Sequence, residues 1–236
     1  MSRIGAIVLS RYSSTRLPGK ALMEIENKKI LEYIIERLQT VLPLHDIVIA
    51  TSDEDSDNQI ECFCQERGIR CYRGDLDDVA KRFYDAARFG GFDYAIRING
   101  DNVLIDTDVL KDMIDICKTK AYDFLSNVKG RTFPKGMSVE IVNVPYYEAL
   151  LDVIETSDYF KEHVMVYLYE HGSQERHYYY MNTTFPEAAG IQFALDTKED
   201  FENIRRIISK FKRPHFEYNM KEIFEIWKEN TCDHKL

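Results

Sequence analysis

The first half of the chain alternates between two patterns of hydrophobic residues. Short, almost continuous apolar runs predict strands that are buried on both faces, as in a parallel sheet. These runs are residues 4–9, 47–50, 69–72 and 94–98. Between them, apolar residues recur every three or four positions, which predicts amphipathic helices at residues 30–42, 58–67, 78–88 and 108–119. Strands that alternate with helices predict an α/β fold with a doubly wound, mostly parallel sheet.

The alternation weakens in the second half. Predicted strands lie at residues 124–127, 138–144, 174–181 and 191–195, and predicted helices at residues 145–155, 159–170, 198–211 and 219–230. No Pro- or Ser-rich linker divides the chain, so we expect a single domain over residues 1–236. We expect residues 130–184 to form a small inserted region, or an extension of the sheet, that contributes to a subunit interface.

Polar and charged segments follow three of the predicted strands. The strand at residues 4–9 is followed by SRYSSTRLPGK, the strand at 47–50 by TSDEDSD, and the strand at 94–98 by NGDN. In open α/β sheets, ligands bind beyond the carboxyl ends of the strands. The three segments therefore predict a single active-site edge, although loops are also polar in proteins where they bind nothing.

Composition narrows the class of protein. The chain has 236 residues, of which 44% are hydrophobic and 30% charged, as in a globular domain with a buried core. A formal net charge of −9 argues against nucleic acid as the main partner. No apolar stretch reaches the roughly 18 residues of a membrane span, and the N-terminus lacks the features of a signal peptide. We therefore expect a cytoplasmic protein whose five cysteines, which lack zinc-ligand spacing, stay reduced.

Three cations, Arg11, Arg16 and Lys20, lie in the segment after the first strand. Arg presents a planar fork that matches phosphate oxygens, and Lys adds a point charge. Gly19 allows close approach of the backbone, and the Ser and Thr residues between the cations add hydroxyl donors. The segment lacks the P-loop pattern, but its charge and length suit a triphosphate. The alternative is a solvated loop whose arginines pair with nearby acids.

Two carboxylates follow other predicted strands. Asp101 comes directly after Gly100, past the strand at residues 94–98, and Asp196 follows the predicted strand at residues 191–195. Mg²⁺ is commonly held by one or two carboxylates, with water and phosphate oxygens as its other ligands. The pair therefore predicts a magnesium site beside the triphosphate. Alone, Gly-Asp also forms ordinary turns, and Asp196 would suit the N-cap of the following helix.

Seven sequence blocks occur in order along most of the chain. They are RYSSTRLPGK, IVIATSDEDSDN, RGDLDDVAKRF, RINGDNVLIDTDVL, GMSVEI, YFKEHV and LDTKEDF. This set resembles the sugar-acid cytidylyltransferases. It is nearest to the spore-coat polysaccharide biosynthesis type, which is related to the acylneuraminate and 3-deoxy-manno-octulosonate cytidylyltransferases. The resemblance implies a Rossmann-like nucleotidyltransferase fold of the glycosyltransferase-A type, with residues 130–184 contributing to the acceptor site and dimer interface.

The resemblance also implies a reaction and residue roles. CMP would pass from CTP to an acidic sugar or related acid, releasing pyrophosphate, for surface polysaccharide synthesis, with Mg²⁺ as cofactor and a homodimer as the assembly. Arg16, Lys20 and Asp101 would be catalytic, and Asp101 and Asp196 would hold the metal. The acceptor would contact Asn102, Glu140 and His163. The nucleotide would contact Leu9, Ser10, Arg11, Arg16, Lys20, Thr51, Ser52, Asp53, Arg73, Arg82, Asn99 and Gly100.

Three departures from the family pattern leave the acceptor and the choice of base open. Asn99 stands where a small or hydroxylated residue is usual, Val103 where Pro is usual, and Tyr12 where a smaller residue is usual. One alternative keeps the reaction but uses another nucleoside triphosphate, or a phosphate or phosphonate acceptor. A second is a nucleotide-binding protein without activity. A third is glycosyl transfer, for which the acidic sequence at residues 53–55 would supply a D-x-D metal motif.

Overall fold

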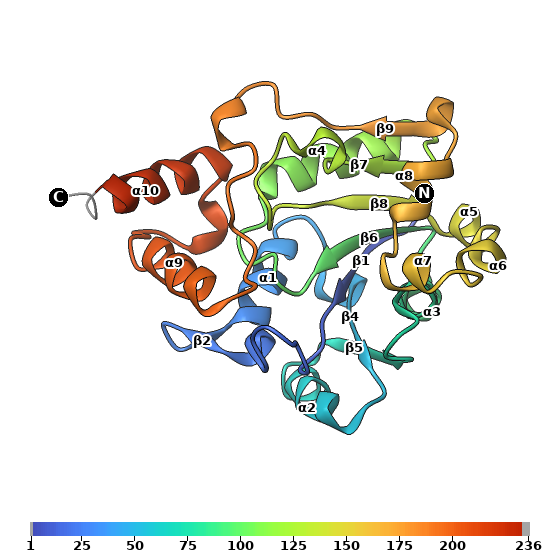
Figure 1. Ribbon diagram of the computed structural model, residues 1–236, viewed down its shortest axis with the longest axis horizontal. Helices are drawn as coiled ribbons and strands as arrows, with labels where there is room; N and C mark the ends of the chain where they lie inside the picture. The colour runs from blue at the N-terminus through green and yellow to red at the C-terminus, as the bar shows by residue number, and fades with distance from the viewer. Residues whose placement is uncertain (1, 233–236) are drawn as a thin grey trace.

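The computed structural model describes residues 2–232 and is built on a seven-stranded sheet (Figure 1). The strand order is β5-β4-β1-β6-β8-β7-β9, so β5 and β9 form the two edges. The strands are β1 (Ile4–Leu9), β4 (Ile47–Ser52), β5 (Arg70–Gly74), β6 (Tyr94–Asn99), β7 (Phe124–Ser126), β8 (Glu140–Asn143) and β9 (His177–Tyr179). Neighbouring strands are parallel except where β8 pairs with β6 and β7. A separate two-stranded sheet pairs β2 (Glu24–Ile25) with β3 (Lys28–Lys29).

Two hydrophobic cores lie on opposite faces of the large sheet. Along β1, Ala6 and Val8 pack into one core and Ile7 into the other, as the pleat of a strand requires. The first core is covered by α1 (Ile30–Leu38), α2 (Asn58–Glu66), α4 (Thr107–Thr119), α9 (Lys198–Ile208) and α10 (Met220–Cys232). The second is covered by α3 (Val79–Gly90), α5 (Val144–Glu148), α6 (Leu151–Ile154), α7 (Asp158–Glu162) and α8 (Val166–His171). The predicted doubly wound α/β fold is confirmed. None of the helices within residues 2–232 is long and apolar enough to cross a membrane.

The carboxyl ends of β1, β4 and β6 lie next to one another, at the end of the sheet where its parallel strands finish. Leu9 lies in register with Ala50 of β4 and with Asn99 of β6. The loops then continue the pairing, since the backbone N–H of Gly100 donates to the Leu9 carbonyl at 2.8 Å. A Cβ at Gly100 would lie 2.7 Å from Cβ of Ser10, so glycine permits this close approach of the two loops.

Residues 130–184 extend the sheet with β8 and β9 and cover one face with α5 to α8. Because β8 runs antiparallel to β6, it begins where the parallel strands end. Its first residue, Glu140, therefore lies in register with Arg97 near the carboxyl end of β6.

Residues 191–195 do not form the predicted strand. Among the described residues, the segment has a single bridge, between Gln192 and Lys135. Its backbone bonds to loops instead: Phe193 donates to the Lys135 carbonyl at 2.9 Å, and Leu195 donates to the Asp101 carbonyl at 3.0 Å. Its apolar pattern reflects Phe193 and Leu195, which are buried in the first core. The segment is thereby tied to the loop after β6.

Several predicted helices are split in two or end earlier than expected. Residues 145–155 form α5 and α6, and residues 159–170 form α7 and α8. His163 caps the C-terminus of α7 with ψ 69°, outside the helical region, so it marks the second break. The predicted helix over residues 30–42 ends at Leu38, and Leu42 donates to the Leu38 carbonyl in the turn that follows.

The side chain of Arg37 fastens the C-terminal part of the chain to the rest. It is fully buried, and its Nη1 donates to the carbonyls of Ile105 at 2.8 Å and Tyr218 at 3.1 Å. Its Nη2 donates to the carbonyl of His215. One guanidinium thus satisfies three carbonyls from two distant segments.

We predict that Arg37→Met lowers the free energy of unfolding by about 3 kcal/mol, because three buried carbonyls lose a charged donor. Urea denaturation measures this. The matched control is Arg205→Met on α9, where the side chain is exposed and bonds to Glu202, and we expect a change within about 0.5 kcal/mol. Equal losses in the two variants would contradict the role given to Arg37.

Candidate active site

The loop after β1 forms a compact turn around Tyr12. The Tyr12 carbonyl accepts hydrogen bonds from the backbone N–H groups of Ser14 at 2.9 Å and Gly19 at 2.8 Å. Gly19 has φ 72°, and a Cβ there would lie 3.1 Å from the Tyr12 ring, so the turn favours glycine. Tyr12 therefore packs against the turn that presents Arg16 and Lys20.

The carboxylate of Asp57 holds the start of this loop. Its Oδ1 accepts from the Tyr12 backbone N–H at 2.6 Å. Its Oδ2 accepts from the Thr51 hydroxyl at 2.7 Å, and from the Ser52 hydroxyl and backbone N–H at 2.5 and 2.8 Å. Burial acts to raise the pKa of Asp57, but these hydrogen bonds outweigh it and lower the pKa. Thr51 and Ser52, expected to contact the nucleotide, are instead fully buried and bonded to Asp57.

Lys20 joins the two carboxylates that the sequence predicts as metal ligands. Its Nζ donates to the Leu195 carbonyl at 2.7 Å, and lies 3.2 Å from Oδ1 of Asp196 and 3.4 Å from Oδ2 of Asp101. A guanidinium nitrogen of Arg16 lies 3.0 Å from the same Asp196 oxygen. Arg16, Lys20, Asp101 and Asp196, from three loops far apart in the sequence, thus form one charged cluster.

Asp101 suits a further cation. Its Oδ1 is buried and has no hydrogen-bond partner within residues 2–232. Burial raises the pKa of the Asp101 carboxyl, as does the charge of Asp196, while Lys20 acts in the opposite direction. No group of three or more His, Cys, Asp or Glu side chains able to hold a metal occurs in the described part of the chain. Two carboxylates still fit Mg²⁺, which takes its other ligands from water and phosphate.

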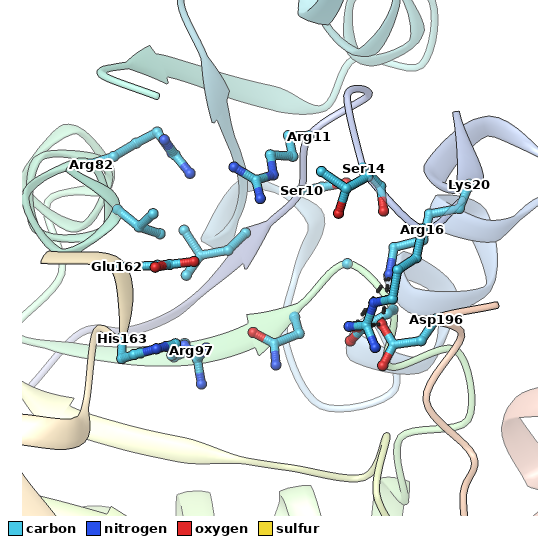
Figure 2. A pocket seen from close by; sticks show the side chains of 16 residues that line it. Ser10, Arg11, Ser14, Arg16, Lys20, Arg82, Arg97, Glu162, His163 and Asp196 are labelled. Atoms are coloured by element: carbon cyan, nitrogen blue, oxygen red, sulfur yellow. Dashed lines mark hydrogen bonds and ion pairs between the residues drawn. The ribbon is translucent and has the colours of Figure 1, made fainter. Parts of the chain in front are cut away.

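These loops border a cavity of about 340 Å³ at the carboxyl ends of the parallel strands (Figure 2). In Figure 2, Arg16, Lys20 and Asp196 gather at one end, and Arg82, Glu162 and His163 lie at the other. The residues predicted to contact nucleotide or metal that line this cavity are Leu9, Ser10, Arg11, Arg16, Lys20, Arg82, Asn99, Gly100, Asp101 and Asp196.

Arg11 and Arg82 add two cations to the wall. Their guanidinium groups turn toward each other in Figure 2. Arg82 is 3% exposed, and its Nη1 donates to the carbonyls of Asp75 and, at 3.1 Å, Leu76. Burial lowers the pKa of Arg82, and the charge of Arg11 lowers it further. A cavity with cations at both ends favours an elongated anion.

Two other residues expected to contact nucleotide do not line the cavity. The guanidinium of Arg73 donates to Glu61 at 2.8 Å and to the side chain of Asn58 at 2.6 Å, and also to backbone carbonyls at the end of β4 and in the loop that follows. Its donors are therefore engaged in holding that loop. Asp53 is exposed, and its backbone N–H donates to the Gly74 carbonyl at 2.9 Å.

A second cavity, of about 410 Å³, adjoins the first and shares Arg97, Asn99 and His163 with it. Glu140 lines this second cavity, so two of the three predicted acceptor residues come together there. Asn102, the third, is buried and lines a different cavity, beside the Asp101 and Asp196 carboxylates.

Sequence reasoning missed Arg97, Glu162 and Asp57. Arg97 carried a usable signal, because a charged residue inside the buried strand YAIRIN is costly unless it is paired. Asp57 is one of several acids in TSDEDSD, and nothing in that sequence distinguishes it from Asp53 or Asp55. Glu162 looks like an ordinary residue of a helix surface.

The parallel sheet with one antiparallel strand, and the cavity of cations and carboxylates at its edge, define an α/β nucleotidyltransferase-like fold. The chain belongs to the cytidylyltransferase family, because the family model described as cytidylyltransferase matches residues 5–228. It is therefore a nucleotidyltransferase.

Individual relatives agree with this assignment. A cytidylyltransferase structure from Leptospira borgpetersenii is 30% identical, with a TM-score of 0.89 over 98% of this chain and 96% of that one. The spore coat polysaccharide biosynthesis protein SpsF of Bacillus subtilis is 29% identical over 214 residues, 89% of this chain and 88% of its own length. The 8-amino-3,8-dideoxy-manno-octulosonate cytidylyltransferase of Shewanella pealeana is 30% identical over 122 residues, 50% of this chain and 49% of its own.

We predict that Asp57→Asn lowers stability, because the amide of Asn would place an N–H donor against groups that now donate hydrogen bonds to the Asp57 carboxylate. The expected loss in the free energy of unfolding is about 2 kcal/mol at pH 7. Folding lowers the pKa of Asp57 from its ordinary 3.8, so its carboxylate stabilises the fold above that value and loses this effect as the pH falls. The difference between variant and wild type should therefore shrink in acid.

Urea denaturation from pH 7 to pH 3 measures this difference. Asp55→Asn is the matched control, because Asp55 is exposed and lies in the same loop. If Asp55→Asn and Asp57→Asn behave alike, Asp57 does not hold the loop.

Proposed function

We propose that the protein transfers CMP from CTP to an acidic sugar or related acid and releases pyrophosphate. The observation that carries the proposal is the charged cluster of Arg16, Lys20, Asp101 and Asp196 at one end of the first cavity. Such a cluster suits the far end of a triphosphate, which is the part that leaves in nucleotidyl transfer.

In this mechanism Arg16 and Lys20 bind the β- and γ-phosphates, while Leu9, Ser10 and Arg11 contact the cytosine and ribose. An acceptor oxygen forms a bond to the α-phosphorus as the bond from that phosphorus to the bridging oxygen breaks. The electron pair leaves with pyrophosphate, whose charge the two cations stabilise. An ionised acceptor oxygen needs no protein base, and a hydroxyl loses its proton to solvent. Alignment and charge neutralisation therefore account for the catalysis.

Asp101 and Asp196 are the residues that would hold Mg²⁺. The ion, when bound, supplies positive charge to the phosphate oxygens. The unpartnered buried oxygen of Asp101 supports this assignment. Before ligands bind, Lys20 and Arg16 balance the charge of the two carboxylates. A triphosphate competes with Asp196 for these two cations.

We place the acceptor in the second cavity, beside Glu140 and His163. Relatives whose names state a sugar acid or a surface polysaccharide support an acidic acceptor and a role in polysaccharide synthesis. We further propose a homodimer to which residues 130–184 contribute, with β9 at the open edge of the sheet and the exposed Met181 beyond it.

Pyrophosphate release with each of the four nucleoside triphosphates, Mg²⁺ and a panel of acceptors tests the proposal. The panel contains sugar acids, sugar phosphonates and sugar 1-phosphates. We expect release with CTP and at least one sugar acid. Release with another triphosphate, or with a phosphate or phosphonate alone, would favour the alternative nucleotidyltransferase. No release with any pair, from protein that remains folded, would overturn the proposal.

We predict that Asp101→Asn lowers kcat at least 100-fold, because the phosphates lose the cation that the carboxylate would hold. Affinity for CTP without Mg²⁺ should not fall, since the variant removes a negative charge near the triphosphate. Fixed-time assays of pyrophosphate release give kcat, and calorimetric titration gives the affinity for CTP. Asp115→Asn, an exposed acid on α4, is the control. Unchanged turnover in Asp101→Asn would exclude Asp101 as the metal ligand.

A further inference from the structure

The pair of Arg97 and Glu140 lies inside the sheet, between the two cavities. The Arg97 Nη1 donates to Oε2 of Glu140 at 2.5 Å, and the two residues face each other across β6 and β8. The side chain of Glu140 is only 3% exposed, whereas that of Arg97 is 21% exposed. The carboxylate is thus the buried partner, and the guanidinium is the partner that reaches the cavities.

A chain of hydroxyl groups holds Glu140 from behind. The Tyr169 hydroxyl donates to Oε1 of Glu140 at 2.6 Å. It can then only accept from the Ser126 hydroxyl, 2.5 Å away, while Ser126 itself accepts from the Val128 backbone N–H at 2.9 Å. Both oxygens of Glu140 are therefore occupied by protein donors. This arrangement leaves Glu140 unsuited to act as a base or to contact the acceptor directly.

The Arg97 guanidinium has N–H groups that do not bond to Glu140. Within residues 2–232, Glu140 is the single hydrogen-bond partner of the Arg97 guanidinium, and the Arg97 Nε has no partner. Arg97 lines both cavities, together with Asn99 and His163. An anion bound to its remaining N–H groups would therefore lie where the nucleotide cavity meets the second one.

The charges of the second cavity point to the same kind of ligand. Its charged lining residues are Arg97, Lys129, Arg131 and Glu140. Arg97 and Glu140 neutralise each other, so Lys129 and Arg131 leave a positive excess. Val128, Met165 and Val166 supply an apolar wall. A ligand with one oxyanion group and a partly apolar body complements this surface.

We propose that Arg97 recognises the carboxylate of the acceptor, and that Glu140, Tyr169 and Ser126 are positioning residues that orient it. This inference rests on the proposed CMP transfer. It names Arg97 as the residue that determines specificity for the acceptor. Arg97 binds the acceptor oxyanion with the donors that Glu140 leaves free. The fixed guanidinium places the acceptor where the two cavities meet.

The test pairs a change in the protein with a change in the acceptor. The acceptor probes are 3-deoxy-manno-octulosonate, or whichever acid of the panel turns over fastest, and the carboxamide of the same acid. In the wild type we expect kcat/KM to be about 100-fold higher for the acid than for the amide. In Arg97→Met this preference should fall to within about threefold, with the Kd for CTP changed less than threefold. Arg205→Met is the control and should keep the preference.

A second set of variants distinguishes the loss of acceptor recognition from a loss of folding. Arg97→Met leaves Glu140 buried without its partner, so Arg97→Met with Glu140→Gln removes both charges together. This double variant should also lose the preference for the acid. Tyr169→Phe keeps the ring and removes the hydroxyl, and should raise the KM for the acid about fivefold at nearly constant kcat.

The outcomes separate the two proposals. If the acid is turned over but Arg97→Met slows acid and amide equally, the role of Arg97 is wrong while the proposed function stands. If Arg97→Met lowers kcat/KM for a phosphonate or phosphate acceptor more than for the acid, Arg97 binds an oxyanion other than a carboxylate. That result also overturns the assignment. If no acid is turned over by folded wild-type protein, both proposals fall.

Discussion

The ammonium of Lys20 joins the loop after β1 to the loop after β6 and to the segment before α9. The Lys20 side chain is 14% exposed, and its ammonium contacts the Leu195 carbonyl, Asp196 and Asp101. Charges gathered out of water are stable only when they compensate one another, and Arg16 completes the balance. The same contacts explain why the cluster suits ligands. An entering anion competes with Asp196 for the cations, and an entering cation competes with Lys20 for Asp101.

Buried charges fasten the other loops of the site in a similar way. Asp57 gathers backbone and hydroxyl donors from the ends of β1 and β4, and Arg82 holds the carbonyls of Asp75 and Leu76. Glu140 holds Arg97 between the two cavities. Each is a single charge bonded to several groups, so the groups that face the cavities are oriented before a ligand arrives. Preorganised donors of this kind stabilise charge in a transition state without reorganising.

The sequence was informative where burial alone determines structure. Strands buried on both faces, such as β1, β4 and β6, appear as almost continuous apolar runs, and the polar segments after them predicted where the active site lies. Residues 191–195 show the same apolar pattern, but their backbone bonds to Lys135 and Asp101, which periodicity does not reveal. Thr51, Ser52 and Arg73 are polar residues near the site whose partners are other protein groups. Only the pairing of β6 with β8 shows that Arg97 meets Glu140.

We propose that the charged cluster receives the end of the triphosphate that leaves, so that the acceptor attacks the α-phosphorus. Phosphorus NMR of a reaction with CTP, Mg²⁺ and a sugar acid tests it directly, because each possible site of attack gives different products. Attack at the α-phosphorus gives equimolar CMP-linked acid and pyrophosphate, so one phosphodiester signal and one pyrophosphate signal appear with integrated intensities of about 1:2. Formation of CDP and a phosphorylated acid would show attack at the γ-phosphorus and contradict the account.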